Sequence, residues 1–231
     1  MEDLRLNSSK LGTEEYWNNF YKKELNNFQE NSEDEGECWF DDSDAESKMI
    51  EFLIQKINNG DIDKTELSIL DLGTGNGHLL YQMTEEFSEE LEVEVKVSMK
   101  GIDYSPDSID FAQKLNTKYQ TDIKFQQVDL LNETLDETYD IILDKGTFDA
   151  IALNQDIVRD NKIGMDIYPE KVIQLMRPGT IFLITSCNFT EEELTKIMTS
   201  HGLRVWDQIT YPTFEFGGVK GTTICSIAFI R

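Results

Sequence analysis

The segment with the clearest chemical potential is Leu70-Asp71-Leu72-Gly73-Thr74-Gly75-Asn76-Gly77-His78. Its three glycines allow a tight turn from a strand into a helix, and they let a ligand approach where a Cβ atom would clash. The spacing is not the G-x-G-x-x-G of dinucleotide dehydrogenases, and no Lys-Ser or Lys-Thr pair follows as in a Walker loop. The segment predicts a ligand site whose contacts are Asp71, Gly73, Thr74, Gly75, Asn76 and Gly77.

Two acidic residues close the next two predicted strands. Asp103, followed by Tyr104, ends the second strand, where a carboxylate can accept both hydroxyl hydrogens of a ribose. Asp129 ends the third strand and can accept from an adenine amino group, with Leu130 against the ring; a plain solvated acid is the alternative interpretation of Asp129. Together these positions indicate an adenosine ligand. The acidic stretch 85–94, interpreted as a surface insertion, lengthens the usual gap between the glycines and Asp103.

The elements that must position these residues alternate between strand and helix after residue 66. Apolar runs predict strands at 68–72, 95–104, 123–129, 139–144 and 180–186, with helices between them. Two further strands, at 203–211 and 222–230, are separated by a segment too short for a parallel crossover, so the last strand should pair antiparallel. The pattern predicts an α/β fold with a doubly wound, mostly parallel sheet that ends in an antiparallel hairpin.

The first 60 residues have a different character. Thr13 is a candidate N-cap for an amphipathic helix whose aromatic face includes Trp17 and Tyr21, and a second helix should end near residue 60. Between them, residues 30–46 carry nine acidic side chains and no Lys or Arg. We therefore predict a helical and acidic extension, 1–60, packed on a core domain, 61–231. Trp39 in the acidic run suits a lid over the pocket or simple packing on the sheet, and His78 is expected to be solvated.

Composition restricts the class of partner. The 231 residues contain 21 Lys and Arg against 45 Asp and Glu, a net charge of -24. Such a field repels a phosphate backbone, which argues against nucleic-acid binding, and attracts a basic protein. Three widely spaced cysteines and two distant histidines show no zinc motif. Neither a signal segment nor an apolar run of roughly 18 residues is visible, so we expect a cytoplasmic monomer without a membrane partner.

Several sequence blocks are distributed over nearly the whole chain: residues 11–17, Cys38-Trp39-Phe40, residues 71–77, Asp144-Lys145-Gly146-Thr147-Phe148-Asp149-Ala150, residues 184–188 and Phe214-Glu215-Phe216-Gly217-Gly218. Together these blocks resemble the elongation factor 1-alpha lysine methyltransferases of fungi and animals. The resemblance implies a Rossmann-like class I fold with seven strands, S-adenosylmethionine as cofactor, and methylation of a lysine of translation elongation factor 1-alpha.

Methyl transfer to lysine requires a neutral amine, which is about one lysine in a thousand near pH 7.4. Asp144, at the end of the fourth strand, is our candidate for orienting the ammonium group or the cofactor's amino group. Phe148 can line the channel by contacting the cation, or pack in the core, and Asp149 is a second carboxylate or a first-turn helix acid. Two other functions stay open: a small-molecule methyltransferase, and a non-catalytic acidic module that binds S-adenosylmethionine or a protein.

Overall fold

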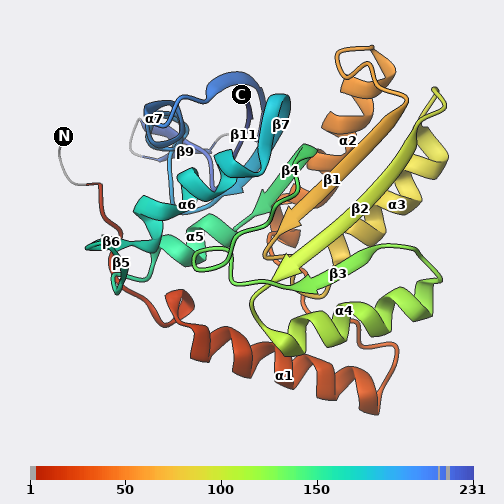
Figure 1. Cartoon of the computed structure of the whole chain (residues 1–231), viewed down its shortest axis with the longest axis horizontal. Coiled ribbons are helices and arrows are strands. Elements are labelled where there is room, and N and C mark those ends of the chain that lie inside the picture. Colours follow the sequence, from red (N-terminus) through yellow and green to blue (C-terminus); the bar gives the residue numbers. More distant parts are fainter. Residues whose placement is uncertain (1–3, 213, 217–218) are drawn as a thin grey trace.

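The computed structural model describes residues 4–212, 214–216 and 219–231 and has one central sheet (Figure 1). The strand order is β3-β2-β1-β4-β7-β11-β8. β11 is antiparallel to both of its neighbours, whereas the pairs from β3 to β7 are parallel. This arrangement confirms the predicted fold class. The seven strands are β1 Glu66–Leu72, β2 Lys96–Asp103, β3 Lys124–Gln127, β4 Tyr139–Lys145, β7 Met176–Ser186, β8 Arg204–Ile209 and β11 Cys225–Ile230.

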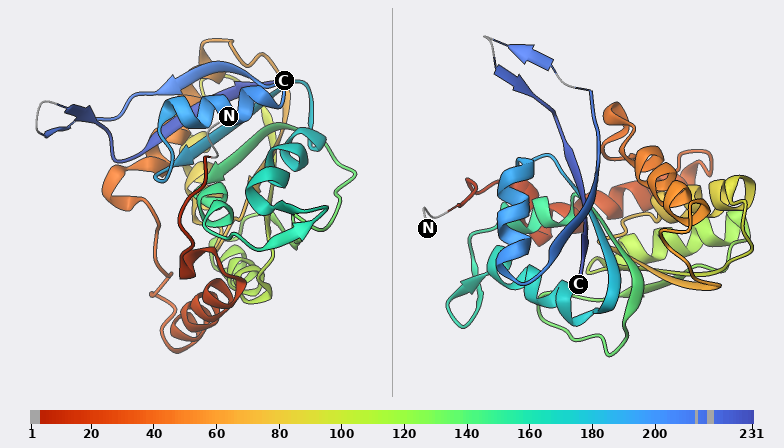
Figure 2. Two further views of the ribbon diagram at one scale, coloured as in Figure 1. Left: turned by 90° about the vertical axis from the view of Figure 1, so that its left-hand side faces the viewer. Right: turned by 90° about the horizontal axis from the view of Figure 1, so that it is seen from above.

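Helices cover both faces of the sheet (Figure 2). Alternation along β1 explains why two layers are needed: Leu67 and Ile69 join one apolar core, and Leu70 and Leu72 join the other. The first core is closed by α2, α3 and α4, and the second by α5, α6 and α7. The helices are α1 Glu14–Glu30, α2 Ala45–Asn58, α3 His78–Glu90, α4 Pro106–Tyr119, α5 Thr147–Ala152, α6 Gly164–Gln174 and α7 Glu191–Ser200.

Short elements in the loops complete the description. Two small antiparallel ladders, β5 Ile157–Arg159 with β6 Lys162–Ile163 and β9 Phe214–Phe216 with β10 Val219–Gly221, were not predicted, because strands of two or three residues show no periodicity. The β9–β10 ladder projects beyond the sheet (Figure 2). Gly217 and Gly218 of the predicted Phe214–Gly218 block lie outside the described residues. Two 3-10 turns also occur: η1 Lys10–Gly12 precedes α1, and η2 Asp41–Ser43 precedes α2.

The N-terminal segment runs along the edge of the domain (Figure 1). The Thr13 hydroxyl caps α1 by accepting from the Tyr16 N–H at 3.3 Å, as the sequence predicts. α1 then lies beside α4, where the rings of Phe28 and Phe111 are 5.3 Å apart. None of the helices in the described residues is both long and apolar enough to cross a membrane.

A charged clamp ties the amino ends of three strands together. The Asp140 carboxylate, on β4, accepts from the N–H and hydroxyl of Ser68 at 2.9 and 2.7 Å. It also accepts from Lys64 and from Arg177 of β7. Burial alone would raise the pKa of Asp140, but the hydrogen bonds from Arg177, Lys64 and Ser68 outweigh it and hold the pKa below its ordinary value. This end of the sheet is therefore structural, and the opposite end remains for a ligand.

Candidate functional site

A cavity opens at the carboxyl ends of β1, β2, β4 and β7, where parallel α/β sheets commonly bind ligands. Its wall combines the turn after β1, the residues that follow the other strands, and residues of the N-terminal segment. The wall includes Leu11, Trp17, Tyr21, Cys38, Trp39, Phe40, Glu46, Asp71, Gly73, Thr74, Gly75, Asn76, His78, Asp103, Tyr104, Lys145, Asp149, Cys187 and Asn188.

The glycine turn forms the floor of the cavity. Gly73, Gly75 and Gly77 all have positive φ, at 63°, 57° and 83°, which strains any other L-residue. A Cβ at position 75 would lie 2.4 Å from the Tyr21 hydroxyl, so α1 approaches the turn closely enough to require glycine. Gly73 and Gly75 line the cavity, as predicted. Gly77 is not among the wall residues; a Cβ there would lie 2.7 Å from the Phe125 ring, which makes it a packing position.

Two buried carboxylates stand beside this turn. Asp103 is 6% exposed and accepts from the N–H groups of Gly75 and Ser105 at 3.0 and 2.9 Å. Desolvation raises the pKa of Asp103, and it raises the pKa of Asp71 to about 7. Each carboxylate has acceptor capacity for several hydrogens. Both are thus placed to accept hydrogens from a bound polar ligand.

Thr74, Asn76 and Tyr104 also occupy the wall, as predicted. The Asn76 amide donates to the Glu35 carbonyl at 2.8 Å and accepts from the His78 N–H at 3.3 Å. The acidic segment is therefore attached to the glycine turn rather than simply solvated. The hydroxyl of Tyr104 reaches the carbonyl of Glu14 at 3.4 Å, which links the end of β2 to α1.

Trp39 lies on the cavity wall, where a lid over the pocket was one interpretation, and it packs on α1, whereas the other interpretation was packing on the sheet. Its ring packs against Trp17 and Phe20 at centroid distances of 5.1 and 5.9 Å, and it lines the cavity. Its buried Nε1 has no hydrogen-bond partner among the described residues, which leaves a donor for a ligand. The wall positions of Leu11 and Tyr21 were missed. The available signal was the aromatic stripe of α1, which needs a surface to cover.

Asp149 faces the cavity beside the end of β7. Its carboxylate accepts from the Cys187 N–H at 2.8 Å and from the Ser186 hydroxyl at 2.5 Å. It is 5% exposed, and burial raises its pKa. The predicted second carboxylate of the site is thus present on the wall. Cys187 and Asn188, which the sequence did not assign to the site, lie beside it because they follow a parallel strand.

Asp144 and Phe148 are not among the wall residues of the cavity, which departs from the role expected for Asp144 and agrees with the core-packing alternative for Phe148. Asp144 is fully buried and accepts from the N–H groups of Thr147 and Phe148 at 2.8 and 3.0 Å and from the Tyr168 hydroxyl. Desolvation raises its pKa to about 8. The Phe148 ring stacks between Tyr168 and Phe189, at 4.8 and 5.0 Å. Both side chains therefore hold α5 in place.

Asp129 and Leu130 are also absent from the wall residues. The two Asp129 oxygens accept from the N–H of Leu131 at 3.0 Å and from the side-chain amide of Asn132 at 2.7 Å, which closes the turn after β3. Leu130 packs on the core beneath α6 and α7. Asp129 therefore closes a turn, a role that neither the adenine contact nor the plain solvated acid described.

Lys145, the last residue of β4, contacts the acidic segment. Its Nζ lies 3.2 Å from Glu46 Oε1 and donates to the Trp39 carbonyl at 2.9 Å. The other Glu46 oxygen lies 2.5 Å from His78 Nδ1. Hydrogen bonds with Cys38 and Glu46 raise the pKa of His78 to about 10. The His78 side chain is 42% exposed, so it reaches solvent as expected, but it also pairs with Glu46.

The sheet order, the glycine turn after β1 and the buried acid that ends β2 define a class I methyltransferase. Residues 63–218 match a family model described as a methyltransferase domain. The solved N-methyltransferase NodS from Bradyrhizobium japonicum, in complex with S-adenosyl-L-homocysteine, shares the fold with a TM-score of 0.61 at 14% identity, over 93% of this chain and 98% of that one.

Relatives that align with nearly the whole chain identify the family within this class. The protein-lysine N-methyltransferase EFM4 of Saccharomyces cerevisiae is 44% identical over 98% of this chain and 96% of its own length. The EEF1A lysine methyltransferase 2 of Homo sapiens is 34% identical over 96% and 86%. The chain belongs to this family of S-adenosylmethionine-dependent protein-lysine N-methyltransferases, which confirms the resemblance seen in the sequence.

Proposed function

We propose that this protein methylates a lysine of translation elongation factor 1-alpha and acts in the cytoplasm as a monomer. The observation that carries the proposal is the wall of one cavity, which joins the glycine turn after β1 to the buried carboxylate of Asp149. The relatives named for EEF1A support the substrate, because they align with nearly the whole chain. A basic factor also suits a net charge of -24.

The cavity has the donors and acceptors that S-adenosylmethionine requires, and this cofactor supplies a methyl group on a positively charged sulfur when bound. Asp103 accepts from the ribose hydroxyls beside Tyr104, while the backbone of the glycine turn and Asn76 faces the rest of the molecule. Asp71 balances positive charge, and the unpartnered Trp39 Nε1 donates to an oxygen of the ligand. Asp129, Leu130 and Gly77 receive no ligand contact in this proposal, because they lie off the wall.

Asp149 positions the target lysine. It holds the incoming ammonium by charge and, since burial raises its pKa, it is able to take up the proton that the amine must lose. Trp17 and Trp39 exclude water from this part of the cavity, which strengthens that interaction. In this scheme residues 1–60 complete the site of the domain 61–231 instead of forming a separate unit.

The test is mass spectrometry of unmodified elongation factor 1-alpha after incubation with the protein and S-adenosylmethionine. We expect mass gains of one or more methyl groups on a single lysine. Asp103→Asn should abolish the gain and weaken cofactor binding measured by calorimetry. Asp122→Asn, which makes the same charge change at an exposed site after α4, should preserve both.

Other outcomes separate the rival functions. Methylation of free amines without the factor would identify a small-molecule enzyme. Cofactor binding without any transfer, to the factor or to proteins of a whole lysate, would identify a non-catalytic binding module. A loss of transfer in Asp122→Asn equal to that in Asp103→Asn would remove the support for the ribose contact.

A further inference from the structure

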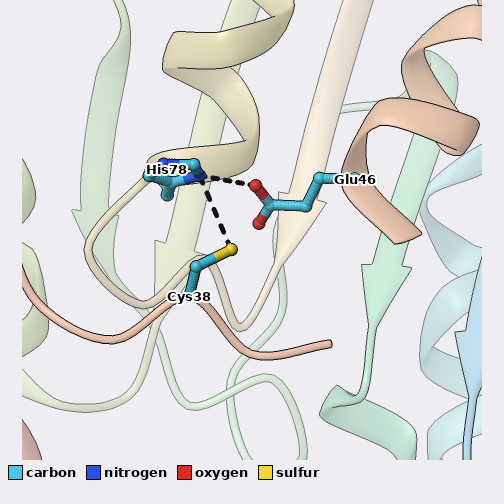
Figure 3. Close-up of side chains that lie close together, drawn as sticks. All are labelled: Cys38, Glu46 and His78. Carbon is cyan, nitrogen blue, oxygen red and sulfur yellow. Dashed lines mark hydrogen bonds and ion pairs between the residues drawn. The ribbon is translucent and has the colours of Figure 1, made fainter. Parts of the chain in front are cut away.

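Three metal-ligating side chains from separate segments meet at one edge of the cavity. Cys38 precedes η2, Glu46 lies in the first turn of α2, and His78 is the first residue of α3. Cys38 Sγ is 3.8 Å from His78 Nδ1, which is 2.5 Å from Glu46 Oε2, and the three atoms lie within 4.8 Å of one another. Figure 3 shows the side chains pointing toward a common point.

We propose that Cys38, Glu46 and His78 form a binding site for one Zn²⁺ ion. A thiolate, an imidazole and a carboxylate are the ligand types that zinc prefers, and three protein ligands leave a fourth position for water. Ligand bonds of about 2.0–2.3 Å in a tetrahedral site are compatible with the 3.8 Å between Sγ and Nδ1. Among the described residues this is the group of three that combines such atoms.

The surroundings of Glu46 allow the ion to bind without breaking the wall. Oε2 faces His78, whereas Oε1 holds Lys145 at 3.2 Å. Zinc replaces the hydrogen bond between Glu46 Oε2 and His78 Nδ1, so these two atoms must separate slightly. The contact between Lys145 and Glu46 Oε1 is kept. A second contact of this kind orients a ligating carboxylate.

The ion also has a route of entry. The three residues line the cofactor cavity and a second cavity on the side of α3 that includes Ser47 and Gln82. The carboxylate is buried, but the His78 side chain is 42% exposed. Zinc binds the deprotonated thiol and imidazole, so the ion replaces the protons of Cys38 and His78 and leaves the net charge of the cluster unchanged. The ion acts instead by occupying the edge of the cofactor cavity. We expect it to inhibit methyl transfer and to stabilise the junction of the acidic segment with α3.

The experiment uses the full chain, treated with chelator and free of cofactor. Titration with ZnCl₂ by calorimetry, in competition with a chelator of known affinity, gives stoichiometry and affinity, and Co²⁺ reports thiolate ligation by its charge-transfer absorption. Cys38→Ser, Glu46→Gln and His78→Gln test the ligands. Cys187→Ser, a thiol on the same wall, and His201→Gln, the other imidazole of the chain, are the matched controls.

The proposal predicts one ion per chain, a cobalt–thiolate band lost in Cys38→Ser, and affinity at least about tenfold weaker in each ligand variant, since even indirect partners of metals contribute that much. Cys187→Ser and His201→Gln should bind as the unaltered protein does. Absence of binding, equal binding by all ligand variants, or loss in the controls would overturn the site. Thermal unfolding in the presence of chelator identifies any variant that fails to fold. The ligand variants that do fold then decide whether the ion binds at this site.

Discussion

Two carboxylates five positions apart, one near the end of β4 and one in α5, take different tasks. Asp144 turns inward and accepts from the first N–H groups of α5, and Asp149 emerges one turn later on the cavity wall. The sequence marked both as site residues because Asp144 ends the predicted fourth strand and Asp149 follows it closely. It could not separate them, because the direction of each side chain depends on where α5 begins, and helix boundaries are the least certain feature of a sequence-based prediction.

We predict that Asp149→Asn lowers kcat by at least about 100-fold and leaves cofactor affinity nearly unchanged. Asparagine can still accept from the Cys187 N–H through its carbonyl oxygen, and its amide group replaces the oxygen that faces the Ser186 hydroxyl, so the side chain keeps its shape and place. It neither attracts an ammonium nor takes a proton. Single-turnover methylation and cofactor calorimetry separate the two effects. The control is Asp156→Asn, which makes the same charge change at an exposed position between α5 and β5. An unchanged kcat would remove Asp149 from the mechanism.

The cluster of Cys38, Glu46 and His78 shows why a metal site can be missed in a sequence. Zinc motifs are recognised in a sequence by short spacings between ligands, and here 40 positions separate Cys38 from His78. Only the packing of the acidic segment against the start of α3 brings them together. The charge of that segment predicted a solvated loop, and the Asn76 contact with the Glu35 carbonyl had no signal in the sequence.

At the scale of elements, the apolar pattern of the sequence was sufficient to predict the strands of the sheet. Each of the seven predicted strands is present. β7 begins earlier than expected, at Met176, because Met176 pairs with Tyr139 ahead of a register shift, and the exposed residues 177–179 that follow Met176 show no apolar pattern. The antiparallel ending followed from loop length alone. What the sequence did not show is the position of α1, whose aromatic face covers the cavity as well as the core. That position depends on long-range contacts between Tyr21 and Gly75 and between η1 and α5.

Gly12→Ala tests how the N-terminal segment seals the cavity. A Cβ at this position would lie 2.4 Å from the backbone carbon of Leu153, which cannot move as a flexible side chain does. We expect a loss of about 1–3 kcal/mol in the free energy of unfolding, typical of overpacking, and weaker cofactor binding. Denaturant unfolding and calorimetry measure these quantities.

Gly60→Ala provides the contrast. Gly60 has φ +78° and nothing within 4 Å of an added Cβ, so the substitution should cost about 1 kcal/mol of conformational strain and leave cofactor affinity unchanged. If the unaltered protein, Gly12→Ala and Gly60→Ala bind the cofactor with equal affinity, η1 is not part of the functional wall.

The Asp140 clamp predicts a specific pH dependence of stability. Its pKa is lower in the folded than in the unfolded chain, so its stabilisation is complete above the unfolded value of about 3.9 and is lost as the pH falls below it. Asp140→Asn should therefore cost about 1–3 kcal/mol at pH 7, and the difference from the unaltered protein should shrink below pH 4. Urea unfolding between pH 7 and 3 measures it. A difference that stays constant down to pH 3 would contradict the assignment.

At the scale of the whole molecule, charge governs encounter with the substrate. A net charge of -24 should accelerate association with a basic protein, and added salt screens that attraction. We predict that kcat/KM for elongation factor 1-alpha falls roughly tenfold between low and several-hundred-millimolar salt, while kcat at saturating substrate changes little. Initial rates over a sodium chloride series measure both quantities. A flat kcat/KM would show that the acidic surface does not steer the substrate.

The place of β11 between β7 and β8 has a consequence for the order of assembly. During synthesis β8 emerges before β11, which is its partner in the sheet. Until β11 is made, β8 stays unpaired and one edge of β7 stays open. Unpaired strand edges of this kind promote aggregation, and late, non-local pairing slows folding. The nascent chain is therefore most vulnerable to misassembly after β7 and β8 are made, which is where we expect a chaperone to act on it.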